Sequence, residues 1–182
     1  MAAYNLIQTQ TLTVATAVIT FSLIPQTYTD LRILCSVRSA ATSANVGNYD
    51  PMGIQFNATT SGYSGREGYG NGSSATASTT LTTMTAFNST TVGRINETGI
   101  NNNNSTANVY SSVEIYIPNY AGSTYKTFNV DYYQEQNQTA NNIGFNGSLW
   151  SNTAAITSVD LFLKDANYMI YSSFSLYGIK NN

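Results

Sequence analysis

The sequence predicts an all-β protein: an antiparallel β-sandwich of the jelly-roll type, with about eight strands and long loops rich in Asn, Gly and Ser. Three observations predict this fold class. Runs in which apolar and polar residues alternate, as in a strand with one buried face, recur almost from end to end of the chain. Clusters of turn-forming residues separate these runs. Apolar residues nowhere keep the helical period over several turns, so any helix must be short.

Four expected strands lie in the first half of the chain. Residues 10–23, TLTVATAVITFSLI, are rich in β-branched residues and form a strand with a break, which ends before Pro25. In residues 30–38, DLRILCSVR, apolar side chains alternate with polar ones. Residues 52–57, MGIQFN, and 79–87, TTLTTMTAF, carry the same pattern after clusters of turn-forming residues.

Four more expected strands lie in the second half. Residues 109–117, VYSSVEIYI, are the clearest, because Val113, Ile115 and Ile117 fall on one side of an extended chain and Glu114 on the other. Pro118 ends this strand, since proline supplies no donor to a strand ladder. The remaining strands are 125–133, YKTFNVDYY, 156–164, ITSVDLFLK, and 172–179, SSFSLYGI.

Strands with one apolar face, joined by loops rather than by helical crossovers, imply antiparallel sheets. Two such sheets bury their apolar faces only against each other, which makes a sandwich, and the long connections favour a jelly roll over a simple meander. An immunoglobulin-like sandwich is the alternative, although the chain lacks a cysteine pair. The single cysteine, Cys35, alternates with Leu31, Ile33 and Val37, which indicates a small buried hydrophobe.

The length of 182 residues fits one domain. Residues 1–12, MAAYNLIQTQTL, are expected to form an extended N-terminal arm, and residues 13–182 the single β-sandwich domain. The stretch 13–25, TVATAVITFSLIP, has no positively charged segment before it and is expected to be strand rather than signal peptide. No run of about 18 apolar residues is present, so no membrane span is expected.

Charged residues make up only 9% of the chain, against about 25% in ordinary globular domains. Asn, Ser, Thr, Gln and Tyr supply the polarity instead, and such a surface bonds water, sugars or another protein without long-range electrostatic steering. The net charge is −2 and the seven Lys and Arg residues are scattered. A nucleic-acid partner is therefore not expected.

The chain contains no histidine, which removes Ser-His-Asp triads, Cys-His dyads and ordinary zinc sites. A pair of carboxylates remains a possible catalyst, as in glycoside hydrolysis. Glu114, Asp131 and Asp160 lie on the polar sides of expected strands and could converge on an open face. A solvated sheet face explains them equally well, and no spacing singles out a pair. We therefore expect no enzyme, no catalytic residue and no cofactor.

Two further segments are interpreted as structural. Residues 131–135, DYYQE, offer two carboxylates but lack the glycine turn and the dense acidic pattern of a calcium loop. Residues 65–72, GREGYGNG, contain glycines but lack the lysine and the strand-to-helix context of a phosphate loop. The first is expected to be a strand end with solvated acids, and the second a surface loop.

Tyrosine is over-supplied, with fourteen residues, several of them beside turns. Its large rigid ring and hydrogen-bonding end favour protein interfaces and sugar-binding sites. We expect partner contacts from such rings and from the apolar side chains of the N-terminal arm. The candidate contact residues are Tyr4, Leu6, Ile7, Tyr63, Arg66, Tyr69 and Tyr120.

Five segments, in conserved order over most of the chain, resemble virion structural proteins of tailed bacteriophages of aquatic bacteria, cyanophages among them. They are 18–33, VITFSLIPQTYTDLRI; 68–74, GYGNGSS; 114–120, EIYIPNY; 148–159, SLWSNTAAITSV; and 174–179, FSLYGI. The Asn-rich middle of the chain, 80–108, departs from the resemblance. The resemblance implies a jelly-roll particle component that decorates the capsid or belongs to a fibre, and it carries over no catalytic residue.

The first hypothesis is a capsid decoration, or cement, protein. It would form a homo-oligomer, expected to be a trimer, on the capsid surface and clamp neighbouring copies of the major capsid protein through many weak contacts. The protein would be made in the cytoplasm of the bacterial host. The arm 1–12 is the candidate segment for reaching a neighbouring subunit.

Two other hypotheses stay open. A receptor-binding head or tail fibre or knob module would contact host surface glycans through loop tyrosines such as Tyr63 and Tyr69. A carboxylate glycosidase would depend on Glu114 or Asp131.

Overall fold

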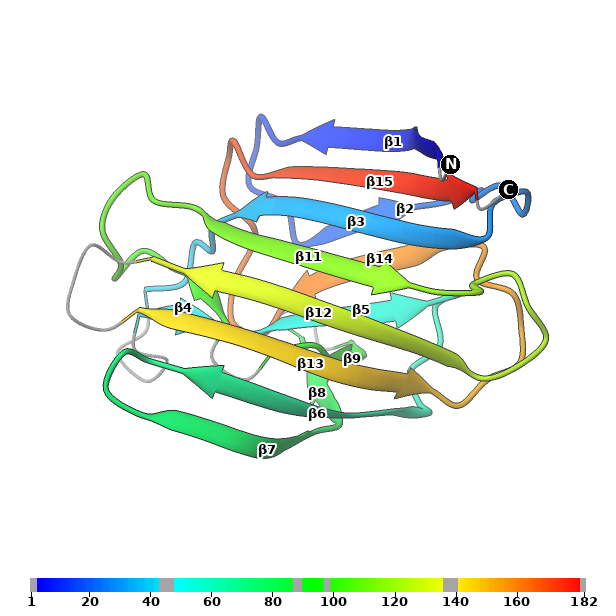
Figure 1. The fold of residues 1–182 in the computed structure, drawn as a ribbon. Helices are drawn as coiled ribbons and strands as arrows, with labels where there is room; N and C mark the ends of the chain where they lie inside the picture. The colour runs from blue at the N-terminus through cyan, green and yellow to red at the C-terminus, as the bar shows by residue number, and fades with distance from the viewer. Residues whose placement is uncertain (1–2, 43–47, 87–89, 97–98, 136–140, 181–182) are drawn as a thin grey trace.

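The computed structural model describes residues 3–42, 48–86, 90–96, 99–135 and 141–180. Within these residues there are fifteen strands and no helix, and every strand pair is antiparallel. An eight-stranded sheet faces a five-stranded sheet, and a two-stranded ladder lies beside them (Figure 1). The predicted all-β antiparallel sandwich is confirmed.

The eight-stranded sheet forms the front layer in Figure 1 and is built from strands of both halves of the chain. Its order is β1 (Ala3–Thr11), β15 (Ser173–Lys180), β3 (Asp30–Val37), β11 (Ser111–Ile117), β12 (Lys126–Gln134), β13 (Asn142–Trp150), β6 (Tyr63–Gly70) and β7 (Ala75–Leu81).

The five-stranded sheet lies behind it. Its order is β2 (Val18–Phe21), β14 (Val159–Leu163), β5 (Met52–Phe56), β9 (Thr91–Arg94) and β8 (Thr83–Thr85), and the ladder pairs β4 (Tyr49–Asp50) with β10 (Ile100–Asn101).

The chain crosses repeatedly between the two sheets. The last two strands, β14 and β15, pair with β2 and β3 from the start of the chain, so the C-terminal end wraps beside the N-terminal end. Only β11, β12 and β13 form a plain meander, in the middle of the large sheet. The expected eight strands undercount the described structure, because two sequence runs are divided between sheets and five strands, β4, β6, β9, β10 and β13, lie outside the expected runs. For example, the expected strand 10–23 is split into β1 and β2, which lie in different sheets.

Two long strands of the large sheet, β6 and β13, lie outside the expected strands. The segment GREGYGNG, expected to be a loop, forms most of β6 and the turn into β7. Gly65 fits the sheet because the neighbouring strand leaves little room for a Cβ, which would lie 2.5 Å from the Ser148 Oγ. Similarly, a Cβ on Gly144 in β13 would lie 2.3 Å from the Tyr132 ring. Glycine here marks close packing rather than a loop.

The N-terminal segment lies in the sheet, where an arm extending from the domain was expected. Residues 3–11 form β1, an edge strand paired along its length with β15, with a register shift between Leu6 and Gln8. Two glutamine side chains then connect β1 to the other sheet. The Gln8 amide donates to the Ser22 carbonyl at 2.7 Å, and the Gln10 amide to the Thr20 carbonyl at 2.9 Å.

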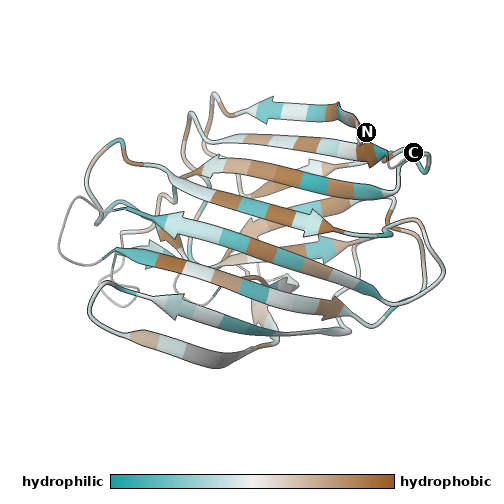
Figure 2. Cartoon of the chain, in the orientation of Figure 1, coloured by the Kyte–Doolittle hydropathy of each residue, from teal (hydrophilic) through white to brown (hydrophobic). Residues whose placement is uncertain are grey.

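The core lies between the sheets and follows the sequence alternation, which is visible along β3 and β11 (Figure 2). Val113, Ile115 and Ile117 are buried, and Cys35 is a buried free thiol, as predicted. Aromatic rings fill the middle: the Phe56 ring lies 5.3 Å from that of Phe128 and 5.4 Å from that of Trp150. No helix of the described part of the chain is long and apolar enough to cross a membrane.

Candidate functional site

The outer face of the eight-stranded sheet is the candidate functional site. Because side chains alternate along a strand, every second residue of this sheet faces away from the core. The antiparallel register aligns these residues in rows that cross the strands. Two adjacent rows matter here. One contains Ser175, Leu34, Glu114, Asp131, Phe145 and Gly68, and the other Ser173, Ser36, Ser112, Tyr133, Ile143 and Gly70.

These two rows line three adjoining depressions. The first lies over β15, β3 and β11, the second over β11, β12 and β13, and the third over β13, β6 and β7. The first and second share Ser112 and Glu114, and the second and third share Ile143 and Phe145. Together they form one continuous depression across seven strands, which we call the outer trough.

Small residues help to form the hollow at both ends of the outer trough. Serines of β15, β3 and β11 line one end, and Gly68 and Gly70 of β6 lie at the other. Phe145 lies against Gly68, where an added Cβ would be 3.1 Å from the Phe145 Cζ. The glycine therefore leaves room for the ring to rest on the neighbouring strand.

Three large apolar side chains stand in the middle of the trough. Phe145 is 66% exposed, Ile143 62% and Tyr133 43%. They occupy β12 and β13, where outward positions of a solvated sheet are usually polar. Their exposure distinguishes this part of the face, because adjacent exposed apolar side chains are characteristic of binding surfaces.

Two acidic residues lie beside these side chains. Glu114 on β11 and Asp131 on β12 are directly opposite each other, a position in which Cβ atoms are about 5 Å apart. Both line the trough. Arg32 on β3 holds the Glu114 carboxylate at two points: its Nε lies 2.6 Å from Oε1, and an NH2 group donates to Oε2 at 2.7 Å.

The ion pair holds the Glu114 carboxylate in place and neutralises its charge with that of Arg32. The hydrogen bond that Arg32 donates to Glu114 raises the pKa of Arg32, and the charge of Glu114 adds to the effect against the opposing desolvation. The guanidinium also lies over the Tyr4 ring of β1, 5.6 Å from its centroid. Asp131 is exposed and has no ion pair among the described residues. The middle of the trough therefore carries one uncompensated negative charge.

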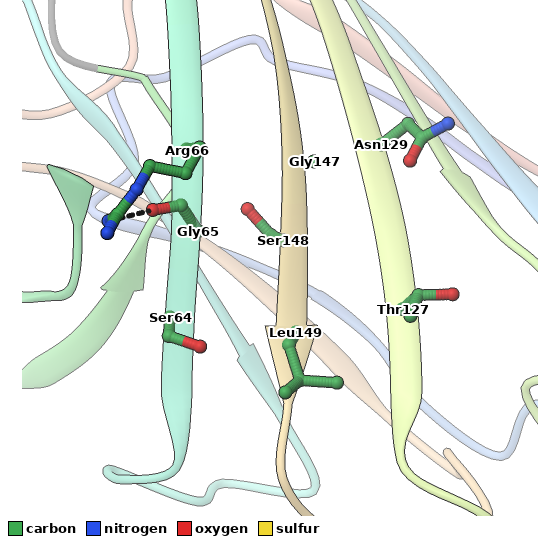
Figure 3. A pocket seen from close by; sticks show the side chains of 8 residues that line it. All are labelled: Ser64, Gly65, Arg66, Thr127, Asn129, Gly147, Ser148 and Leu149. Carbon is green, nitrogen blue, oxygen red and sulfur yellow. Dashed lines mark hydrogen bonds between the residues drawn. The ribbon is translucent and has the colours of Figure 1, made fainter. Parts of the chain in front are cut away.

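A second groove, of about 590 Å³, lies on the same face near the other end of β12, β13 and β6 (Figure 3). It forms over Gly147, where an added Cβ would meet nothing within 4 Å. Thr127 and Asn129 line it from β12, and Arg66 from β6. The Arg66 guanidinium donates to Thr80 Oγ1 at 2.7 Å. Leu149 also lines this groove, and no aromatic ring of the described residues does.

The structure places the predicted contact residues in different environments. Tyr4 and Leu6 are each 55% exposed on β1, and Ile7 is half-buried against the core. Arg66 lines the second groove, and Tyr69 lines the trough. Tyr4, Leu6, Arg66 and Tyr69 therefore lie on one sheet, but at three separate sites: the β1 edge, the second groove and the trough.

Tyr63 and Tyr120 are buried, so neither ring is exposed for the partner contact that the sequence predicted. Tyr63 is 8% exposed and its ring stacks on that of Trp150, 6.4 Å between centroids. Its hydroxyl accepts from the Phe56 amide at 2.8 Å and donates to the Thr59 carbonyl at 3.1 Å. Tyr120 is fully buried, and its hydroxyl donates to the Pro25 carbonyl. Each ring packs in the core and each hydroxyl pairs with backbone.

The three acids expected to converge do so only in part. Glu114 and Asp131 meet on the outer face, but Asp160 lies on β14 in the other sheet, where it accepts from the Thr20 hydroxyl at 2.6 Å. In the segment DYYQE, Asp131 lies on the outer face while Glu135 accepts from the Tyr133 hydroxyl at 2.7 Å. No group of three or more potential metal-ligating side chains occurs among the described residues.

The sequence interpretation missed Phe145 and Ile143. The signal was present in NIGFNGSLW, residues 142–150, where large apolar residues alternate with Gly and Asn. An ordinary half-buried strand points its apolar side inward. Here Asn142, Gly144 and Asn146 point inward, and Ile143 and Phe145 point outward. The inverted alternation became recognisable only once the strand was placed.

Comparison with known proteins gives no family. No family model matches the sequence, and no curated protein matches it. Among solved structures, the chain has weak similarity to a fructofuranosidase from Schwanniomyces occidentalis in complex with fructose, with 7% identity and a TM-score of 0.28. The alignment covers 98% of this chain but 34% of that one, so this chain spans about a third of its length. A similarity at this level supports no argument about function.

Proposed function

We propose that this chain is a non-enzymatic structural protein of a bacteriophage particle, a decoration protein that binds the major capsid protein and stabilises the shell. The resemblance of five segments to phage virion proteins supports the particle. The adhesive, weakly charged surface supports a binding role. In this proposal the protein is made in the host cytoplasm and resides on the capsid surface.

The observation that carries the proposal is the free edge of β1. This nine-residue strand ends the large sheet, so its backbone groups on the side away from β15 are not paired in the sheet (Figure 1). Proteins usually blunt such an edge with lysine or proline, and AYNLIQTQT contains neither. The register shift at Ile7 interrupts the edge but leaves regular segments on both sides.

The apolar side chains of β1 favour the same conclusion. Tyr4 and Leu6 are more than half exposed beside this edge. The edge strand β2 of the other sheet differs, because Gln10 bonds its Thr20 carbonyl and Gln8 bonds the Ser22 carbonyl just after it. An assembly that covers β1 would pair its backbone and bury its apolar side chains. We propose a homotrimer at a symmetric position of the shell, with β1 in its contacts.

In this mechanism the affinity for the capsid comes from many repeated contacts. Each contact is weak and uncharged, and a trimer that engages several capsid subunits at once multiplies the affinity of single contacts. Low charge has a measurable consequence: binding that does not depend on ion pairs is insensitive to salt.

Copy number in purified particles tests the location. Quantitative mass spectrometry of particles is expected to find this chain in numbers comparable with the major capsid protein. A few copies per particle would contradict decoration and indicate a tail or fibre component.

A charge placed at the β1 edge tests the contact. Leu6→Lys is expected to convert the oligomer to monomer in light scattering, because a lysine at an edge blocks strand pairing. Tyr125→Lys is the matched control, since Tyr125 is 59% exposed and lies outside the strands. A wild-type chain that is monomeric at all concentrations, or an oligomer unaffected by Leu6→Lys, would contradict the proposal.

A separate experiment tests the proposal that the chain is not an enzyme. Incubation of the chain with neutral polysaccharides is expected to release no reducing ends. Release that disappears in Asp131→Ala would instead support the glycosidase hypothesis.

A further inference from the structure

We propose that the outer trough binds an extended, uncharged polysaccharide. The inference goes beyond the decoration function and does not rest on it, because the trough lies on the sheet face and β1 lies at the sheet edge. Four features of the trough support this inference: its length, its mixed apolar and polar lining, its charge, and the pairing of the backbone beneath it within the sheet.

The length of the trough favours a chain-like ligand. It crosses from β15 to β7, which is six strand spacings of about 4.8 Å, or ~29 Å. Its three parts measure about 270, 360 and 360 Å³, so none is a deep enclosed pocket. A ligand that uses the whole trough must lie along it.

The lining combines apolar surfaces with hydrogen-bonding groups. Phe145 and Tyr133 offer ring surfaces, on which the C–H faces of a sugar pack. Asp131, directly across from Glu114, offers carboxylate oxygens as acceptors for sugar hydroxyls. Ser36, Ser112 and Ser175 add hydroxyls at the other end. Sugar rings carry both kinds of surface.

The charge selects a neutral ligand. Arg32 is the nearest cation, and it is held by Glu114 at both carboxylate oxygens. Asp131 remains uncompensated within the described ion pairs. The trough would therefore repel a sulfated or uronic-acid polymer, and likewise a nucleic acid.

The backbone beneath the trough disfavours an extended peptide. β3, β11, β12, β13 and β6 each pair with a strand on both sides, so their backbone groups are used within the sheet. Extended peptides bind sheets mainly by adding a strand at an edge. A ligand that crosses the strands must bond side chains, and a polysaccharide presents hydroxyls in every unit for this purpose.

The experiment uses the full chain and paired probes. Affinity electrophoresis is run in gels that contain dextran, mannan, laminarin or galactan, each beside its sulfated form. The wild-type chain is expected to be retarded by at least one neutral polymer and not by the sulfated form. Phe145→Ala is expected to weaken that binding about ten-fold or more, because it removes the most exposed ring in the lining of the trough.

Two further variants keep the test decisive. Asp131→Ala replaces an exposed side chain, so it supplies a second loss of binding should Phe145→Ala fail to fold by circular dichroism. Tyr125→Ala removes an exposed ring outside the trough and is expected to bind like wild type. Retention by no neutral polymer, retention only by sulfated forms, or retention unchanged in both trough variants would overturn the inference. In the proposed function β1 mediates assembly, so the oligomeric state is measured independently of polysaccharide binding.

Discussion

At the scale of single residues, Asp50 shows how burial acts against charge. It is fully buried and accepts hydrogen bonds from the Ser39 hydroxyl at 2.6 Å and from the Lys164 and Asp165 amides at 3.2 and 3.0 Å. These bonds favour the carboxylate, but desolvation outweighs them and raises the pKa of Asp50 to about 6, with a smaller contribution from the charge of Asp165.

The raised pKa predicts a pH-dependent stability. Because the folded chain favours protonated Asp50, its contribution is complete below the unfolded pKa of 3.8 and is lost as the pH rises through about 6. The difference amounts to at most about 3 kcal/mol. Asp50→Asn keeps an acceptor and removes the charge, so urea denaturation between pH 4 and 7.5 is expected to show a flatter profile for the variant. Parallel profiles for both proteins would contradict this account.

Tyr63 gives a second prediction at this scale. Tyr63→Phe leaves the buried Phe56 amide without the hydroxyl that accepts its hydrogen bond, which costs about 1–3 kcal/mol. The midpoint of urea denaturation is expected to fall, while binding to polysaccharides and particles stays unchanged. Tyr69→Phe, at a half-buried ring, is the control and is expected to leave stability near wild type. If Tyr63→Phe lost binding to polysaccharides or particles while its stability stayed that of the wild type, Tyr63 would instead be a contact residue, as the sequence predicted.

At the scale of strands, alternation of apolar and polar residues predicted β3 and β11, whereas the glycine and asparagine content of β6 and β13 suggested turns. β3 and β11 follow the alternating pattern closely, and each pairs with a neighbour in the large sheet. β6 and β13 were not expected, because glycine and asparagine are typical of turns. Their place in the sheet depends on space left by other strands, and that information is not local in the sequence.

The two glycines of β13 test this explanation. A Cβ on Gly144 would lie 2.3 Å from the Tyr132 ring, whereas one on Gly147 would meet nothing within 4 Å. Gly144→Ala is expected to destabilise the fold by about 1–3 kcal/mol through overpacking. Gly147→Ala is expected to be neutral or to stabilise by up to about 1 kcal/mol, because it restricts the unfolded chain. Equal thermal denaturation midpoints for the two variants would show that packing at Gly144 is not the reason for its glycine.

β1 is an edge strand in the segment where the sequence predicted an extended arm. Residues 1–12 were expected to form an arm, but pairing of residues 3–11 with β15 and the bonds of Gln8 and Gln10 connect this segment to both sheets. Its removal would uncover the edge of β15 as well. The substitution of Leu6 is therefore a cleaner test of assembly than a deletion, because it leaves these bonds in place.

At the scale of the whole molecule, the sandwich was predictable and the site was not. One-faced strands without helices allow few architectures, and the low charge indicated adhesion. The trough needs the order β15, β3, β11, β12, β13, β6 and β7, which combines residues from Leu34 to Ser175. Only Glu114, Asp131 and Tyr69 of its lining had been singled out, since no pattern in the sequence states which strands are neighbours.

The separation of the two surfaces predicts independent effects. Leu6 lies on the edge strand, and Phe145 lies five strands away on β13. Distant substitutions with no shared contacts act additively. Leu6→Lys is expected to abolish the oligomer and to lower apparent polysaccharide affinity only by the loss of multivalency, with binding of a short oligosaccharide unchanged. Phe145→Ala is expected to lose oligosaccharide binding and to keep the oligomeric state.

Light scattering of both variants measures the oligomeric state, and isothermal titration calorimetry measures oligosaccharide binding. Dissociation of the oligomer by Phe145→Ala would make the trough a subunit interface, because a ring that only faces a sugar contributes nothing to assembly.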